Sequence, residues 1–75
     1  MADQVLDLRG LNCPVPILRA RRALKNLPAG ATLQVFATDP SAGEDFETYC
    51  RTSGNELVEC KHEKNVFSVL IKRKF

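Results

Sequence analysis

The residues best suited to chemistry in this 75-residue chain form the run Cys13-Pro14-Val15-Pro16. A cysteine thiolate is the nucleophile in sulfur exchange. The run precedes a helical pattern, which predicts that Cys13 is the N-cap of a helix. There the helix dipole favours the thiolate and would lower the pKa of the thiol. Because Pro14 and Pro16 have no N–H group, the amide of Val15 is predicted to be free to point at the sulfur.

An alternative is that Cys13 only caps the helix and lies in the core, as many free cysteines do. Ser, Thr, Asp and Asn are the usual caps, so a structural cap has no need of sulfur, which favours a reactive Cys13. Cys50 and Cys60 are predicted to be buried structural thiols. Three cysteines with no C-x-x-C motif and no four-ligand zinc spacing predict neither a disulfide framework nor a metal site.

Charged residues near Cys13 are candidates for docking a partner protein. Arg19 and Arg22, on the predicted helix, would jointly dock an acidic partner, and Arg9 would act in the same way or simply be exposed. The basic residues of that helix are Arg19, Arg21, Arg22 and Lys25. Asp39 is interpreted as a turn or helix-entry residue.

The polar and apolar patterning predicts strands over residues 5–8, 32–38, 56–62 and 66–72, and helices over residues 13–27 and 41–51. Residues 9–12 are predicted to form a tight connection after the first strand, in which Gly10 and Asn12 tolerate a positive φ. Ser41 and Glu44 have the spacing of a capping box. The helix stripe predicted to face inward consists of Ile17, Leu18, Ala20, Ala23, Leu24 and Leu27.

The element order βαβαββ predicts a two-layer α/β (α+β) sandwich in one domain, residues 1–75. Right-handed crossovers would place both helices on one face of a four-stranded mixed sheet, whose last two strands form a hairpin. Asp39, at the end of the second strand, would then lie beside the Cys13 loop. The chain has no apolar run of the roughly 20 residues that span a membrane and no secretory signal, which predicts a cytoplasmic protein without a membrane partner.

The segment from Leu6 to Pro16 closely resembles the signature of the TusA/SirA-like sulfur-carrier family, in which an Asp is followed by Gly-Leu-x-Cys-Pro-x-Pro and a helix. The resemblance continues through Ala23-Leu24, Gly30, Asp39-Pro40, Asp45, Gly54, Glu56-Leu57 and Leu70-Ile71-Lys72. It implies the βαβαββ sandwich and a persulfide on Cys13, and it makes Asp39 a candidate for partner contact or proton handling. It also implies a sulfur donor, such as a pyridoxal-phosphate cysteine desulfurase, an acceptor protein, and no cofactor in the carrier itself.

The family's best-known branch supplies sulfur for thiolation of the tRNA wobble uridine, and other branches serve sulfur oxidation, molybdenum-cofactor supply or selenium metabolism. A carrier is consumed and regenerated stoichiometrically, so the sequence does not decide whether this protein counts as an enzyme. Two other functions compete with the carrier. One is a small RNA-binding module, which the net charge of +2 does not favour. The other is a protein-interaction domain in which the Cys-Pro-x-Pro run is only a helix cap. A monomer is the simplest expectation.

Overall fold

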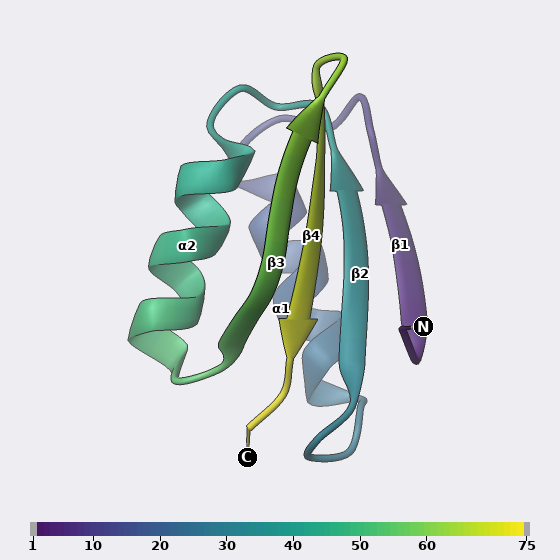
Figure 1. Ribbon diagram of the computed structural model, residues 1–75, viewed down its shortest axis with the longest axis vertical. Helices are drawn as coiled ribbons and strands as arrows, with labels where there is room; N and C mark the ends of the chain where they lie inside the picture. Colours follow the sequence, from purple (N-terminus) through teal and green to yellow (C-terminus); the bar gives the residue numbers. More distant parts are fainter. Residues whose placement is uncertain (1, 75) are drawn as a thin grey trace.

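The computed structural model describes residues 2–74 of the chain (Figure 1). The elements are β1 (Gln4–Leu8), α1 (Val15–Lys25), β2 (Thr32–Ala37), α2 (Ala42–Ser53), β3 (Glu56–Glu63) and β4 (Val66–Lys72). This is the predicted βαβαββ order. Neither helix of the described residues is long and apolar enough to cross a membrane.

The four strands form one mixed sheet in the order β1-β2-β4-β3. Strand β1 is parallel to β2, with Leu8 opposite Ala37 at their carboxyl ends, while β4 is antiparallel to both of its neighbours. The predicted β3–β4 hairpin is therefore present. The parallel β1–β2 pair has a consequence for function, because the loops that leave these two strands emerge at the same edge of the sheet, at the top of Figure 1.

The core lies between the sheet and the two helices. Alternating residues of β2 and β4 supply its centre, and Phe46 of α2 covers them. The largest fully buried side chains are Phe46, Leu33, Ile71, Val35 and Val69. Cys50 is buried on α2, as predicted. The prediction for Cys60 was wrong: it is exposed, because β3 is an edge strand and most of its side chains remain open to solvent.

Helix α1 faces the core through Ala20, Ala23 and Leu24. Ile17 and Leu27 pack against the core in part, as predicted. The prediction for Leu18 was wrong, since this side chain is 53% exposed. Leu18 lies about 200° around the helix axis from Ala20, two residues away, and so points away from the sheet.

Candidate functional site

Cys13 lies in the loop that joins β1 to α1, and its side chain is exposed. The predicted N-cap was wrong by one residue, because Pro14 is the N-cap and the helix begins at Val15. The N–H of Val15 donates to the carbonyl of Asn12 at 2.9 Å, which closes a turn ahead of the helix. The Val15 amide is therefore used in this turn, and the prediction that it points freely at the sulfur was wrong. The Cys13–Pro14 peptide bond is cis.

The loop that carries Cys13 is held to the end of β2. Gly10 has a positive φ of 86°, which glycine tolerates, and its N–H donates to Oγ1 of Thr38 at 2.8 Å. Pro16 is buried against the core, whereas Pro14 is exposed beside Cys13. The loop is thus fixed at both ends, and the cysteine between them is left at the surface.

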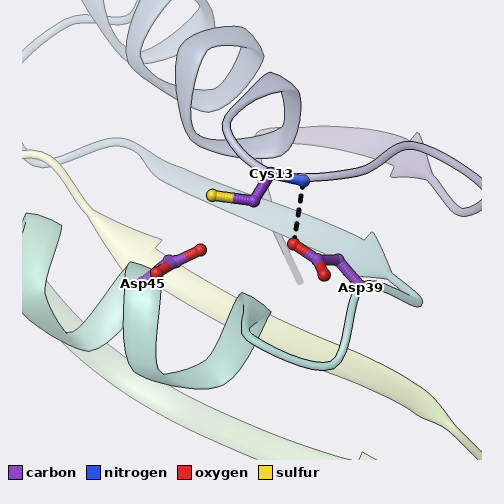
Figure 2. A group of neighbouring side chains, drawn as sticks. All are labelled: Cys13, Asp39 and Asp45. Carbon is purple, nitrogen blue, oxygen red and sulfur yellow. Dashed lines mark hydrogen bonds between the residues drawn. The ribbon is translucent and has the colours of Figure 1, made fainter.

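Asp39 follows β2 directly and is 9% exposed. Its Oδ2 accepts a hydrogen bond from the backbone N–H of Cys13 at 2.9 Å, drawn in Figure 2, and another from Oγ of Ser41 at 3.1 Å. Its own carbonyl accepts from the N–H of Ala42 at 2.9 Å, at the start of α2. Asp39 is therefore a helix-entry residue, as first interpreted, and it also lies beside the Cys13 loop, as the parallel strands predicted.

Ser41 is the N-cap of α2, but the expected capping box does not form. Its side chain makes no capping hydrogen bond to the helix. The hydroxyl donates instead to Oδ2 of Asp39 at 3.1 Å. Ser41 thereby helps to hold the carboxylate that positions the Cys13 backbone.

Asp45 is the site residue that the sequence reasoning missed. It lies in the first turn of α2 and extends toward the sulfur of Cys13 (Figure 2). The Sγ of Cys13 and one carboxylate oxygen from each of Asp39 and Asp45 all lie within 4.8 Å of one another. The three residues come from three different elements, so their spacing in the sequence could not reveal the group.

The two carboxylates raise the pKa of the Cys13 thiol above its ordinary value. The largest cause is a hydrogen bond with the Asp45 side chain. It is followed by partial desolvation and by the negative charges of Asp45 and Asp39, while the Ser41 hydroxyl acts weakly in the opposite direction. The predicted lowering of this pKa was wrong, because the helix begins two residues after Cys13 and two carboxylates lie within 4.8 Å of the sulfur.

A groove of about 550 Å³ runs between α1 and α2, with Cys13 in its lining. The lining residues are Cys13, Pro14, Ile17, Arg21, Glu44, Asp45, Thr48, Tyr49, Thr52 and Ser53. Of the basic residues on α1, Arg21 lines this groove, whereas Arg19 and Arg22 are exposed outside its lining. The groove is open and mixed in charge, which suits a segment of another molecule better than a small enclosed ligand.

Arg9, the fourth candidate for docking, forms a bidentate ion pair with Asp7. Its Nε lies 2.8 Å from Oδ1 and its Nη2 lies 2.8 Å from Oδ2. The hydrogen bonds from Arg9 lower the pKa of Asp7 to about 2. The positive charge of Arg9 is thus paired with the carboxylate of Asp7, at the end of β1.

No metal site was predicted, yet the group around Cys13 brings together the donor atoms of one. A thiol and two carboxylates are ligands that divalent zinc accepts, but structural zinc sites have four protein ligands. The described residues supply three here. A hydrogen bond between the Cys13 thiol and a carboxylate explains this arrangement without a metal ion.

A model of the family described as sulfurtransferase TusA matches residues 4–73. The chain belongs to the TusA sulfurtransferase family. The resemblance found in the Leu6–Pro16 signature is thereby confirmed. The matched region contains the Cys-Pro-x-Pro run, both carboxylates and all six elements of the fold.

Curated members of the TusA family match almost the whole chain. A sulfur carrier protein TusA of Allochromatium vinosum is 49% identical over 71 residues, which cover 95% of this chain and 93% of that protein. A putative sulfur carrier protein of Neisseria meningitidis is 42% identical, with 99% and 100% covered. A sulfur carrier protein TusA of Pseudomonas putida is 40% identical, with 96% and 90% covered.

The crystal structure of a SirA-like protein from Desulfitobacterium hafniense has the same fold. It superposes with a TM-score of 0.84, and the match covers 96% of this chain and 99% of that one at 24% sequence identity. The predicted two-layer sandwich, with a four-stranded mixed sheet and two helices, is thus confirmed by the element order, the sheet topology and this structural neighbour.

Proposed function

We propose that this protein is a sulfur carrier that holds sulfur as a persulfide on Cys13. The observation that carries the proposal is the placement of Cys13, an exposed thiol on a fixed loop that lines an open groove. The relatives named as sulfur carrier proteins support it. A nucleophilic thiol that must meet a second protein has to be accessible in this way, whereas the buried Cys50 cannot be reached.

The transfer step needs no external oxidant. The Cys13 thiolate attacks the outer sulfur of a donor persulfide, R–S–S–H, and a new bond forms between Sγ and that sulfur. The S–S bond of the donor breaks, and its electron pair leaves with the inner sulfur, which takes up the proton that Cys13 lost. A thiol and a persulfide thus exchange one sulfur atom, as in thiol–disulfide exchange. Delivery to an acceptor thiol repeats the same step.

The partners that follow from this chemistry are a cysteine desulfurase or another persulfide donor, and a downstream acceptor protein. We place the carrier in the cytoplasm as a monomer that needs no cofactor of its own. Docking through Arg19 and Arg22 stays a prediction. Both side chains are exposed on α1, one of the two helices that border the groove.

The destination that we propose for the sulfur is the wobble uridine of tRNA, which the best-known branch of the family serves. Deletion of the gene is expected to lower the 2-thiouridine content of tRNA, measured by liquid chromatography and mass spectrometry of digested tRNA. The wild-type gene should restore the modification and a Cys13→Ser gene should not. An unchanged content of 2-thiouridine would redirect the proposal to sulfur oxidation, molybdenum-cofactor supply or selenium metabolism.

The direct test is the intact mass of the protein after incubation with cysteine and a cysteine desulfurase, recorded without reductant. The wild type is expected to gain one sulfur atom, which a reductant removes again. Cys13→Ser should gain none. Cys60→Ser is the matched control, because it removes the other exposed thiol, and it should gain sulfur as the wild type does.

Absence of the gain with several desulfurases and with small persulfide donors would overturn the carrier proposal. The interaction domain and the RNA-binding module would then be the functions to test. Salt-dependent binding of RNA in the absence of any partner would favour the second.

A further inference from the structure

The sulfur of Cys13 faces negative charge from two elements. Asp39 at the end of β2 and Asp45 on α2 both place a carboxylate oxygen within 4.8 Å of Sγ. Glu44 lines the same groove on the α2 side, and Arg21 is the positive residue that lines it on the α1 side. Any molecule that reacts with Cys13 must bring its own sulfur into this field.

The two carboxylates have different roles in the structure. Asp39 is buried and accepts hydrogen bonds from the Cys13 backbone and from Ser41, so it holds the loop in place. Asp45 is half-buried and acts on the sulfur itself, through its hydrogen bond and its charge. Asp45 can therefore be altered with less effect on the loop than Asp39.

We propose that Asp45, together with Asp39, makes Cys13 selective for reaction partners that carry positive charge beside their reacting sulfur. In the free protein the same carboxylates hold Cys13 as a thiol, so that it reacts slowly with neutral and anionic sulfur compounds. A cationic side chain next to the sulfur of a docked donor or acceptor would offset the carboxylates and favour attack. Asp45 is a positioning residue in this scheme. The scheme rests on the proposed function for its role in the cell, but not for its test.

The test uses two small disulfides of opposite charge, cystamine with ammonium groups and 3,3′-dithiodipropionate with carboxylates. In each reaction the Cys13 thiolate attacks one sulfur, the Sγ–S bond forms, and the other sulfur leaves as a thiolate that takes up a proton. The measured quantity is the ratio of the two second-order rate constants, followed by mass spectrometry at Cys13 in a Cys60→Ser background.

This ratio reports charge selectivity alone. The fraction of Cys13 present as thiolate is the same in both reactions, so it cancels in the ratio. The leaving thiols differ between the two reagents, but this difference is the same for every variant and cancels when variants are compared. Unit charges about 7 Å apart in water change a rate by about threefold, so reagents of opposite charge should differ by about tenfold at low salt.

Asp45→Asn is expected to lower the ratio several-fold, and raising the salt concentration should lower the wild-type ratio because the Debye length shortens. Asp45→Glu, which keeps the charge, should retain most of the selectivity. Glu47→Gln is the matched control. It removes one negative charge from an exposed position of α2 outside the Cys13 group, and its ratio should stay at the wild-type value.

The proposal is overturned if Asp45→Asn has the wild-type ratio, or if Glu47→Gln lowers the ratio as much. A wild-type ratio that does not depend on salt would also overturn it, and this measurement needs no variant of Asp45 to fold. The carrier proposal fails by a different result, the absence of sulfur gain on Cys13 in the desulfurase experiment. The charge-selectivity proposal and the carrier proposal can therefore be overturned independently of each other.

Discussion

At the scale of single residues, the reactivity of Cys13 is decided by short distances. A helix terminus favours a thiolate over roughly one turn, but α1 begins two residues after Cys13. The carboxylates of Asp39 and Asp45 lie within 4.8 Å of the sulfur, and they act against the thiolate. Their hydrogen bond and charge outweigh any effect of the helix terminus, so the pKa of the Cys13 thiol is raised.

This balance predicts a specific pH dependence. Because the folded protein raises the pKa of Cys13, alkylation of Cys13 by iodoacetamide should reach half of its maximal rate at a higher pH in the native protein than in the same protein in urea. The rate is followed by peptide mass spectrometry in a Cys60→Ser background. The sign follows from the charges, since neighbouring carboxylates disfavour the anion. A native midpoint at or below that of the unfolded chain would show that the helix terminus prevails after all.

The other two cysteines show how the position of a thiol in the fold determines its exposure and its pKa. Cys50 faces the core from α2, and burial raises its pKa to about 11. Cys60 lies on edge strand β3 and is exposed, and partial desolvation together with Glu47 raises its pKa. Because Cys60 is the other exposed thiol, Cys60→Ser removes a competing site of modification and is a suitable background for work on Cys13.

At the scale of elements, α1 is fixed at both of its ends by residues distant in sequence. Its N-terminal end is held through the hydrogen bond from the backbone N–H of Cys13 to the carboxylate of Asp39. At its last end, one guanidinium nitrogen of Arg73, just after β4, donates to the carbonyls of Leu24 at 2.9 Å and Lys25 at 3.0 Å. The same nitrogen also donates to the carbonyl of Leu27. The Leu24 carbonyl also accepts a hydrogen bond from the N–H of Leu27 at 3.1 Å. A positive charge beside the last carbonyls of a helix is favourable.

Arg73→Ala is therefore expected to lower the free energy of unfolding by about 2 kcal/mol, since hydrogen bonds to a charged group contribute about 1.5–3 kcal/mol. Urea unfolding followed by circular dichroism measures this change. Lys72→Ala is the matched control: this neighbouring basic side chain is exposed, and its loss should cost less than about 0.5 kcal/mol. Equal effects of the two substitutions would show that Arg73 stabilises the protein only through its positive charge. Its hydrogen bonds to the carbonyls at the end of α1 would then contribute nothing.

At the scale of the whole molecule, the sheet order β1-β2-β4-β3 assembles the site. The parallel β1–β2 pair brings the Cys13 loop and Asp39 to one edge, and α2, which starts at the same edge, adds Asp45 (Figures 1 and 2). Ligands in α/β sheets gather at the carboxyl ends of parallel strands. The site of this protein follows that rule with only two parallel strands.

The distribution of charge over the molecule also bears on function. The basic run that closes the described chain is partly engaged, since Arg73 binds the end of α1 and Nζ of Lys74 lies 3.4 Å from Oε1 of Glu56. The carboxylates around Cys13 repel the phosphates of a nucleic-acid backbone.

Much of the fold could be predicted from the sequence because its signals are local. Alternation in residues 32–38 and 66–72 marks strands, the inward stripe from Ile17 to Leu27 marks a helix, and a βαβ unit has one favoured handedness. Cys13 was also identified in this way, from a Cys-Pro-x-Pro run at a predicted strand–helix junction. Even the proximity of Asp39 to its loop followed from the expectation that the first two strands are parallel.

The tertiary structure alone decided how Cys13 behaves. The first helical residue of α1 is set by a turn that ends at the carbonyl of Asn12. The exposure of Cys60 follows from the place of β3 at an edge of the sheet. The proximity of Asp45 to Cys13 depends on how α2 packs beside α1. Electrostatic effects on a thiol fall off with distances of a few ångströms, and such distances between separate elements are set by packing. The sequence by itself therefore determined the fold and singled out Cys13 as the candidate reactive residue, while packing decided the charge environment of its sulfur.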